Sequence, residues 1–153
     1  MGVSFEQRFR VFACALNAHV GSIAKAVDKR FGAGGRDVLR RVQGVEGVTM
    51  GEMLKLVSPR EGFKSVGALY VRFVNVFGVD TEVEVRKDAV VVEVPKCPYG
   101  LEGTSRELCG AMMALDVSVV RTMSPDVSLE IVKTVAAGDP RCKLSVRRAL
   151  SAK

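Results

Sequence analysis

The stretch "TEVEVRKDAVVVEVPKCPYG", Thr81 to Gly100, decides the fold class because its apolar and polar residues alternate. Two runs of valine flank the polar turn "RKD": Val83 and Val85 before it, and Val90, Val92 and Val94 after it. Successive side chains of a β-strand point to opposite faces, so a period of two indicates strands with one packed face. The stretch therefore predicts a β-hairpin that ends at the Cys97-Pro98 turn.

Helical patterns precede this hairpin. Apolar residues recur every three or four positions from Ser4 to about Phe31, which predicts one long amphipathic helix. The run Gly32-Ala33-Gly34-Gly35 is expected to end it, since glycine tolerates the left-handed cap conformation. Three further helices are predicted: one from about Asp37 that Gly44 and Gly47 break, one over Met50–Val57 behind a Thr49–Glu52 capping box, and one behind a Ser58–Glu61 box that Gly78 stops.

A helix and a second hairpin follow the first hairpin. Thr104-Ser105-Arg106-Glu107 forms another capping box, which predicts a helix from Ser105 to about Val120. Residues 129–136 and 142–148 are predicted as strands around the Ala137-Gly138-Asp139-Pro140 turn. The chain is thus expected to be α+β, with N-terminal helices and an antiparallel sheet of about four strands in two hairpins with an intervening helix. We expect a single domain over 1–153, with a helical part, 1–57, and an α+β core, 58–148.

Bulk composition excludes several classes of protein. The 153 residues are 48% hydrophobic and 26% charged, a globular balance. The N-terminal ten residues lack the apolar segment of a signal peptide, and no early apolar run could cross a bilayer. The net charge is +6, but acidic residues are interleaved with the basic ones, so a nucleic-acid partner is not favoured. We expect a cytoplasmic protein without a membrane partner.

Three of the four cysteines follow bends of the predicted fold. Cys97 ends the second strand, Cys109 lies five residues into the capped helix, and Cys142 opens the last strand in phase with Leu144. Strand ends and a helix start can bring such residues together as a metal or cluster site, although the spacing is not that of a zinc finger. The alternative is that all three are buried packing residues, which is common for free cysteine. The pattern leaves both interpretations open.

The segments "FGVDTEVEVRKDAVVVEVPKCPYG" and "LEIVKTVAAGDPRCKLSV" resemble the vinyl-4-reductase-type, or hydrocarbon-binding, superfamily. The likeness spans roughly residues 63–146 and is greatest to the archaeal and bacterial branch that is L-2-amino-thiazoline-4-carboxylic acid hydrolase-like. It implies an α+β ligand-binding domain, often a homodimer, with a small apolar pocket between sheet and helices. It also implies that Cys97, Cys109 and Cys142 hold a metal, usually zinc, near that pocket.

Position 134 departs from the superfamily pattern. Some members have a cysteine eight residues before the last one, where this chain has Thr134, a poor zinc ligand. Three thiolates would therefore need a water, a carboxylate or an exogenous ligand to complete a zinc site. A three-cysteine iron–sulfur cluster with an open iron is the alternative cofactor.

Four other residues are of types that could contribute to a site. His19, the only histidine, lies near the apolar stripe of the first helix and is interpreted as a helix-face residue rather than a ligand. Cys14, beside the same stripe, is expected to pack in the core. Glu107 and Glu130 are near the cysteine segments and could supply a fourth ligand or a base, although Glu107 is better explained as a capping acid.

Three functions follow from these observations. The first is a non-enzymatic binding or sensor protein for a small apolar or sulfur-containing ligand, with zinc or an iron–sulfur cluster at Cys97, Cys109 and Cys142. The second is a hydrolase that uses a thiolate or a metal-bound water; it is less favoured because no Cys–His pair is evident. The third is a dimeric interaction module without a cofactor, in which the first helix pairs with its own copy or a partner.

Overall fold

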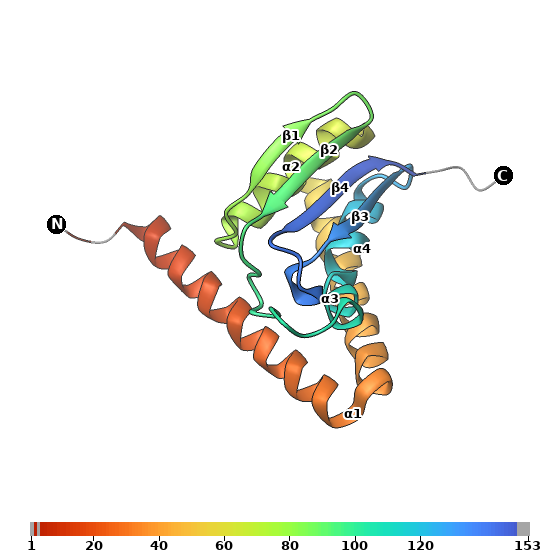
Figure 1. Cartoon of the computed structure of the whole chain (residues 1–153). Coiled ribbons are helices and arrows are strands. Elements are labelled where there is room, and N and C mark those ends of the chain that lie inside the picture. Colours follow the sequence, from red (N-terminus) through yellow and green to blue (C-terminus); the bar gives the residue numbers. More distant parts are fainter. Residues whose placement is uncertain (1, 3, 150–153) are drawn as a thin grey trace.

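The described residues of this computed structural model, 2 and 4–149, form four helices, one 3-10 turn and a four-stranded antiparallel sheet (Figure 1). The predicted α+β class is confirmed. The elements in chain order are α1 (Phe5–Val57), α2 (Gly62–Val76), β1 (Glu82–Val85), β2 (Ala89–Val94), α3 (Arg106–Met112), α4 (Ala114–Met123), β3 (Val127–Lys133), the 3-10 turn η1 (Val135–Ala137) and β4 (Cys142–Arg148).

The sheet has the strand order β1-β2-β4-β3, with every neighbouring pair antiparallel. Val92 lies opposite Val83 on one side and opposite Leu144 on the other. Val94 pairs with Cys142, so Cys142 shares a face with Leu144 as the alternation predicts. The first predicted hairpin is confirmed, and pairing of β2 with β4 joins it to the second.

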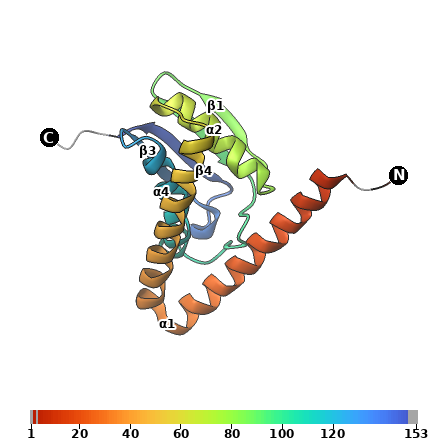
Figure 2. The same ribbon diagram turned by 180° about the vertical axis from the view of Figure 1, so that it is seen from behind.

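All four helices lie on one side of the sheet (Figures 1 and 2). Helix α2 contacts β2 and β4, and α4 contacts β3, so these two helices bury the valine face. The core contains Val66, Tyr70, Val90, Val92, Val119 and Val146, all at most 2% exposed. The opposite face of the sheet carries ion pairs from Arg141 to Glu82 and Glu93, and from Arg147 to Glu130.

Helix α1 bends sharply at Gly32, whose φ of 55° and ψ of −131° are not helical. Residues 5–31, called here the N-terminal arm, begin behind a Ser4–Gln7 capping box and lead away from the sheet (Figure 1). Residues 33–57, the C-terminal arm, return along α4. Glycine takes a positive φ without steric cost, so the predicted end of the first helix near Phe31 corresponds to this bend.

The C-terminal arm is one helix, so the predicted breaks at Gly44 and Gly47 are wrong. Gly47 and Gly51 are buried, and a Cβ on Gly47 would overlap the Leu115 carbonyl oxygen of α4. A Cβ on Gly51 would lie 2.7 Å from the Cβ of Thr122. These glycines therefore permit close helix packing, and tertiary contact outweighs their poor helix propensity.

Several predicted element boundaries also differ. Thr49 lies inside α1, where its hydroxyl donates to the Val45 carbonyl at 3.2 Å, so its capping box is wrong. Helix α2 begins at Gly62 with no side-chain cap, so the Ser58–Glu61 box is wrong too. Ser105 rather than Thr104 caps α3, and the predicted single helix is divided at Met113 into α3 and α4. Strand β3 begins and ends earlier than predicted, because residues 135–137 form η1.

Large apolar side chains are exposed along both arms of α1. On the N-terminal arm Phe5 is 83% exposed and Phe12 is 63% exposed, so the predicted apolar stripe is largely outside the core. Val45 and Leu56 are exposed on the C-terminal arm. Within the described part of the chain, no helix is both long and apolar enough to span a bilayer.

The substitution Gly47→Ala should lower the free energy of unfolding by about 1–3 kcal/mol, because the new methyl group must push the C-terminal arm away from α4. Urea unfolding followed by circular dichroism measures this. Gly34→Ala is the matched control, because a Cβ at Gly34 meets nothing within 4 Å. That variant should gain about 0.5–1 kcal/mol from helix propensity. Equal stability of the two variants would contradict the packing role of Gly47.

Candidate functional site: an apolar cavity with a buried carboxylate

A cavity of about 310 Å³ lies between the two arms of α1, helix α2 and the inner face of the sheet. Its walls are predominantly apolar and include four aromatic side chains: Tyr70, Phe73, Phe77 and Tyr99. The volume is at the lower end of small-molecule sites, so it suits a compact ligand. The superfamily resemblance implied a pocket at this place, between sheet and helices.

The N-terminal arm closes one side of the cavity, to which it contributes Leu16, Asn17 and Val20. Two loops hold the arm in place. The Asn17 side-chain amide donates to the Phe77 carbonyl at 3.1 Å, and the Lys25 ammonium donates to the Gly100 carbonyl at 3.0 Å. The fully buried Ala24 of the arm also packs in the cluster that contains Cys97 and Leu101, so the position of the arm is coupled to the loop that lines the cavity.

Gly21 sets how closely the arm approaches the loop after β2. A Cβ at this position would overlap the backbone carbonyl of Tyr99. The arm therefore lies directly on the loop that carries Cys97, Pro98 and Tyr99 into the cavity wall. No feature of the sequence distinguished Gly21 from the other glycines, because the contact joins residues far apart in the chain.

The structure brings Cys97, Cys109 and Cys142 to the wall of this cavity. The fully buried Thr134 lies between two of them. Its hydroxyl donates to the Cys109 sulfur at 3.1 Å, and the Cys142 thiol lies 4.0 Å from the same hydroxyl oxygen. Position 134, the departure from the superfamily pattern, is thus part of the cysteine cluster.

Two thiols of this cluster, Cys97 and Cys109, favour their neutral form. Burial raises the pKa of Cys97 and of Cys109, and the neighbouring Cys142 raises both further. The residues that the structure describes contain no group of three or more His, Cys, Asp or Glu side chains arranged to hold a metal ion. Binding of zinc or an iron–sulfur cluster by Cys97, Cys109 and Cys142 therefore stays a prediction.

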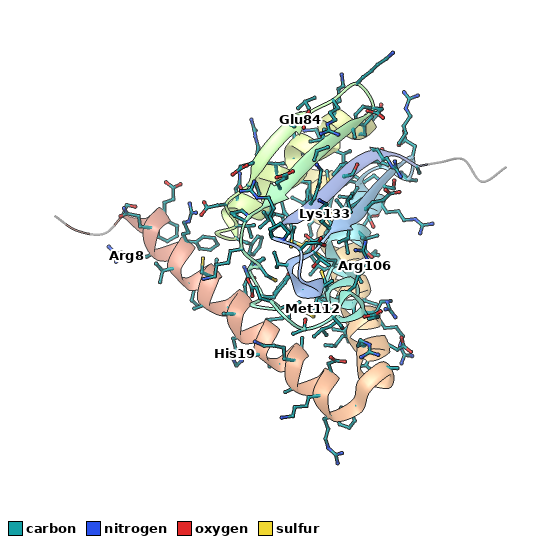
Figure 3. The ribbon with its side chains drawn as sticks, viewed as in Figure 1. Arg8, His19, Glu84, Arg106, Met112 and Lys133 are labelled. Atoms are coloured by element: carbon teal, nitrogen blue, oxygen red, sulfur yellow. The ribbon has the colours of Figure 1, made fainter. Side chains whose placement is uncertain are left out.

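The other candidate residues from the sequence lie outside the cavity. His19 is exposed and points away from the sheet (Figure 3). Cys14 is exposed rather than packed in the core, so that prediction is wrong; its thiol lies 3.7 Å from the Gly78 carbonyl. Glu107 is exposed in the first turn of α3, and Glu130 pairs with Arg147 on the far face of the sheet. Neither glutamate is among the residues that line the cavity.

Sequence reasoning missed the buried polar pair of the cavity, Asp116 and Tyr70. The Tyr70 hydroxyl donates to Asp116 Oδ1 at 2.9 Å, and the two residues are 2% and 6% exposed, respectively. Asp116 precedes the buried Val119 and Val120 of α4 by three and four positions and so lies on the apolar side of its helix, which was the available signal. Its partner lies 46 residues away, on a stripe that looked simply apolar.

Burial controls the protonation of this pair. Desolvation raises the pKa of Asp116 to about 6, although the hydrogen bond from Tyr70 partly opposes the shift. Desolvation, and then the negative charge of Asp116, raise the pKa of Tyr70 well above its ordinary value. At pH 7 the pair is therefore a carboxylate that accepts a hydrogen bond from a neutral phenol.

Comparison with known proteins supports the fold rather than a family. No protein-family model matches the sequence, and neither does any curated protein. A solved structure of similar fold is the phenol-responsive sensory domain of the transcription activator PoxR with phenol. The TM-score is 0.55 and the identity is 13%, over 86% of this chain and 74% of that one. Membership of the vinyl-4-reductase superfamily stays a prediction.

The buried carboxylate predicts a pH dependence of stability. Between pH 4 and about 6 the folded chain keeps a proton on Asp116 that the unfolded chain has lost, so stability falls as pH rises through this window. The titration of Asp116 should lower the free energy of unfolding by about 2–3 kcal/mol between pH 4 and 7.5. Asp116→Asn should remove that drop in urea titrations. Asp88→Asn, in the exposed hairpin turn, controls for general charge effects. An identical pH profile for Asp116→Asn and wild type would refute the assignment.

Proposed function

We propose that this chain is a small-molecule-binding domain of the sensory type, and that the cavity beneath the N-terminal arm is its binding site. The observation that carries the proposal is the combination of an apolar, aromatic-rich cavity with a single buried polar pair, Asp116 and Tyr70. Apolar walls favour the body of a compact ligand, and a few placed polar groups fix its orientation. The fold likeness to a sensory domain solved with phenol is consistent with this role.

The N-terminal arm supplies a route for signalling. A ligand in the cavity would touch the arm at Leu16 and Val20, and also the loop that the arm contacts at Tyr99. Occupancy would therefore favour one position of the arm over others, which is the differential contact that a sensor requires. The exposed apolar side chains of both arms give a second copy of the chain a surface to cover. The homodimer stays a prediction.

Binding is favoured over catalysis for this cavity. A thiolate nucleophile needs a lowered pKa, whereas burial raises the pKa of Cys97 and Cys109. The single histidine, His19, is exposed on the outer side of the N-terminal arm and cannot serve as their base. A hydrolase would therefore depend on metal-bound water, which makes it conditional on the metal site.

Calorimetric titration with three single-ring probes, benzylamine, benzyl alcohol and benzoate, tests the binding function. At least one should bind with a dissociation constant of roughly 1 mM or lower. Val92→Phe should weaken that binding at least about tenfold, because Val92 lines the cavity and the larger ring occupies ligand space. Val85→Phe, the same change at a 64% exposed position of β1, is the control. Binding that Val92→Phe leaves unaltered would place the site elsewhere.

The cysteine cluster is the second candidate function, a site for zinc or an iron–sulfur cluster. The contacts of Thr134 with Cys109 and Cys142 favour it. They bring two thiols to position 134, where some members of the resembled superfamily have a further cysteine. Anaerobically purified protein is expected to carry stoichiometric zinc, or iron with sulfide. Cys142→Ser should lose this metal, and Cys14→Ser, outside the cluster, should retain it. Equal metal content in the two variants, or none in the wild type, would exclude the site.

A further inference from the structure

The charge of the cavity is opposite in sign to that of the chain. The sequence contains 23 Lys and Arg residues against 17 Asp and Glu, for a net charge of +6. Nevertheless, among the described residues that line the cavity, none is Lys, Arg or His, whereas two are acidic, Asp116 and Glu46. A basic protein has thus placed only negative formal charge around this space.

Among the residues that the structure describes, Asp116 has no cationic partner. Its hydrogen bonds come from the Tyr70 hydroxyl and from its own backbone, and no basic side chain is among the groups that act on it. A carboxylate that is 6% exposed loses most of its hydration and is normally paired with a cation or a metal. The described part of the chain supplies no such partner, and a cationic ligand in the cavity would provide one.

The aromatic walls fit the same kind of ligand. Tyr70, Phe73, Phe77 and Tyr99 all line the cavity, and the Phe73 and Phe77 rings pack edge to face with centroids 5.0 Å apart. The faces of aromatic rings attract cations, most strongly where water is excluded, and rings around a site are a recurrent way to hold an ammonium group. Apart from the polar Asn17 and Gln43 and the two acids, the remaining walls are proline, aliphatic side chains, methionine and cysteine, which suit an apolar body.

We propose that the ligand of this cavity is a small organic cation, a protonated amine on a compact apolar body, with Asp116 as its counter-ion. The proposal rests on the binding function proposed above and specifies the ligand class of the same site. Tyr70 holds one oxygen of Asp116 by its hydroxyl and thereby orients the carboxylate. Tyr70 is thus a positioning residue.

Glu46 marks the mouth of the cavity, through which a ligand would enter. It belongs to the exposed side of the C-terminal arm and also lines the cavity, so its carboxylate lies where the cavity meets solvent. An acidic group at the mouth raises the local concentration of cations and disfavours anions. Glu46 and Asp116 therefore form an outer and an inner acidic position along one route.

The three probes named above test this inference, because they share a benzyl or phenyl body and differ in charge at pH 7.5. Benzylamine, the cation, should bind at least about tenfold more tightly than neutral benzyl alcohol, and benzoate should not bind. Asp116→Asn should remove the advantage of benzylamine over benzyl alcohol while leaving benzyl alcohol binding within about threefold. Glu130→Gln, which removes an exposed acid on the far face of the sheet, is the matched control and should preserve the advantage.

The outcomes separate the two proposals. If benzyl alcohol or benzoate binds as tightly as benzylamine, or if Asp116→Asn keeps the preference for the amine, the cationic ligand class is wrong and the binding function stands. If none of the three probes binds, both proposals fail. Asp116→Asn retains the shape of the side chain, and its circular dichroism spectrum and urea unfolding establish that it is folded before binding is measured.

Discussion

The C-terminal arm of α1 approaches α4 so closely at Gly47 that no side chain fits between the helix and the Leu115 carbonyl. This approach fixes α4 between α1 and the sheet, and α4 carries Asp116. It also fixes where the bend at Gly32 lies, and beyond that bend the N-terminal arm lines the cavity with Leu16, Asn17 and Val20. A different spacing between α1 and α4 would move the inner carboxylate and the cover of the cavity together.

The features that suit the cavity for binding also lower the stability of the fold. Its walls join the main valine core to the cluster around Cys97, Cys109 and Met112, which is buried between α1, α3 and η1. A cavity in an apolar core and a buried carboxylate both reduce the stability of a folded chain. Structures retain such costs most often at sites that bind or react. None of the described residues that line this cavity is Lys, Arg or His.

The sequence predicts the local elements of this molecule better than its long-range contacts. The alternating valines identify the hairpin, and the phase of Cys142 with Leu144 places its side chain on the packed face. In contrast, Gly44 and Gly47 look like helix breakers until α4 is known to lie against them, since propensity describes an isolated helix. The capping boxes at Thr49 and Ser58 fail similarly, because the required residue types occur at positions where the chain is already helical or turns differently.

The prediction of the candidate site likewise succeeds where it depends on local features and fails where it depends on a long-range contact. Bends at strand ends and at a helix start predict that the three cysteines meet, but the Asp116–Tyr70 pair depends on two helices that cross far apart in sequence. A single aspartate in an apolar helical run does not reveal its partner.

The two tyrosines of the cavity have an optical consequence. The chain contains no tryptophan and only two tyrosines, Tyr70 and Tyr99, and both line the cavity. Absorbance and emission in the near ultraviolet therefore arise almost entirely from the walls of one space. Spectra that report global folding in most proteins will in this one follow the solvation and packing of its cavity.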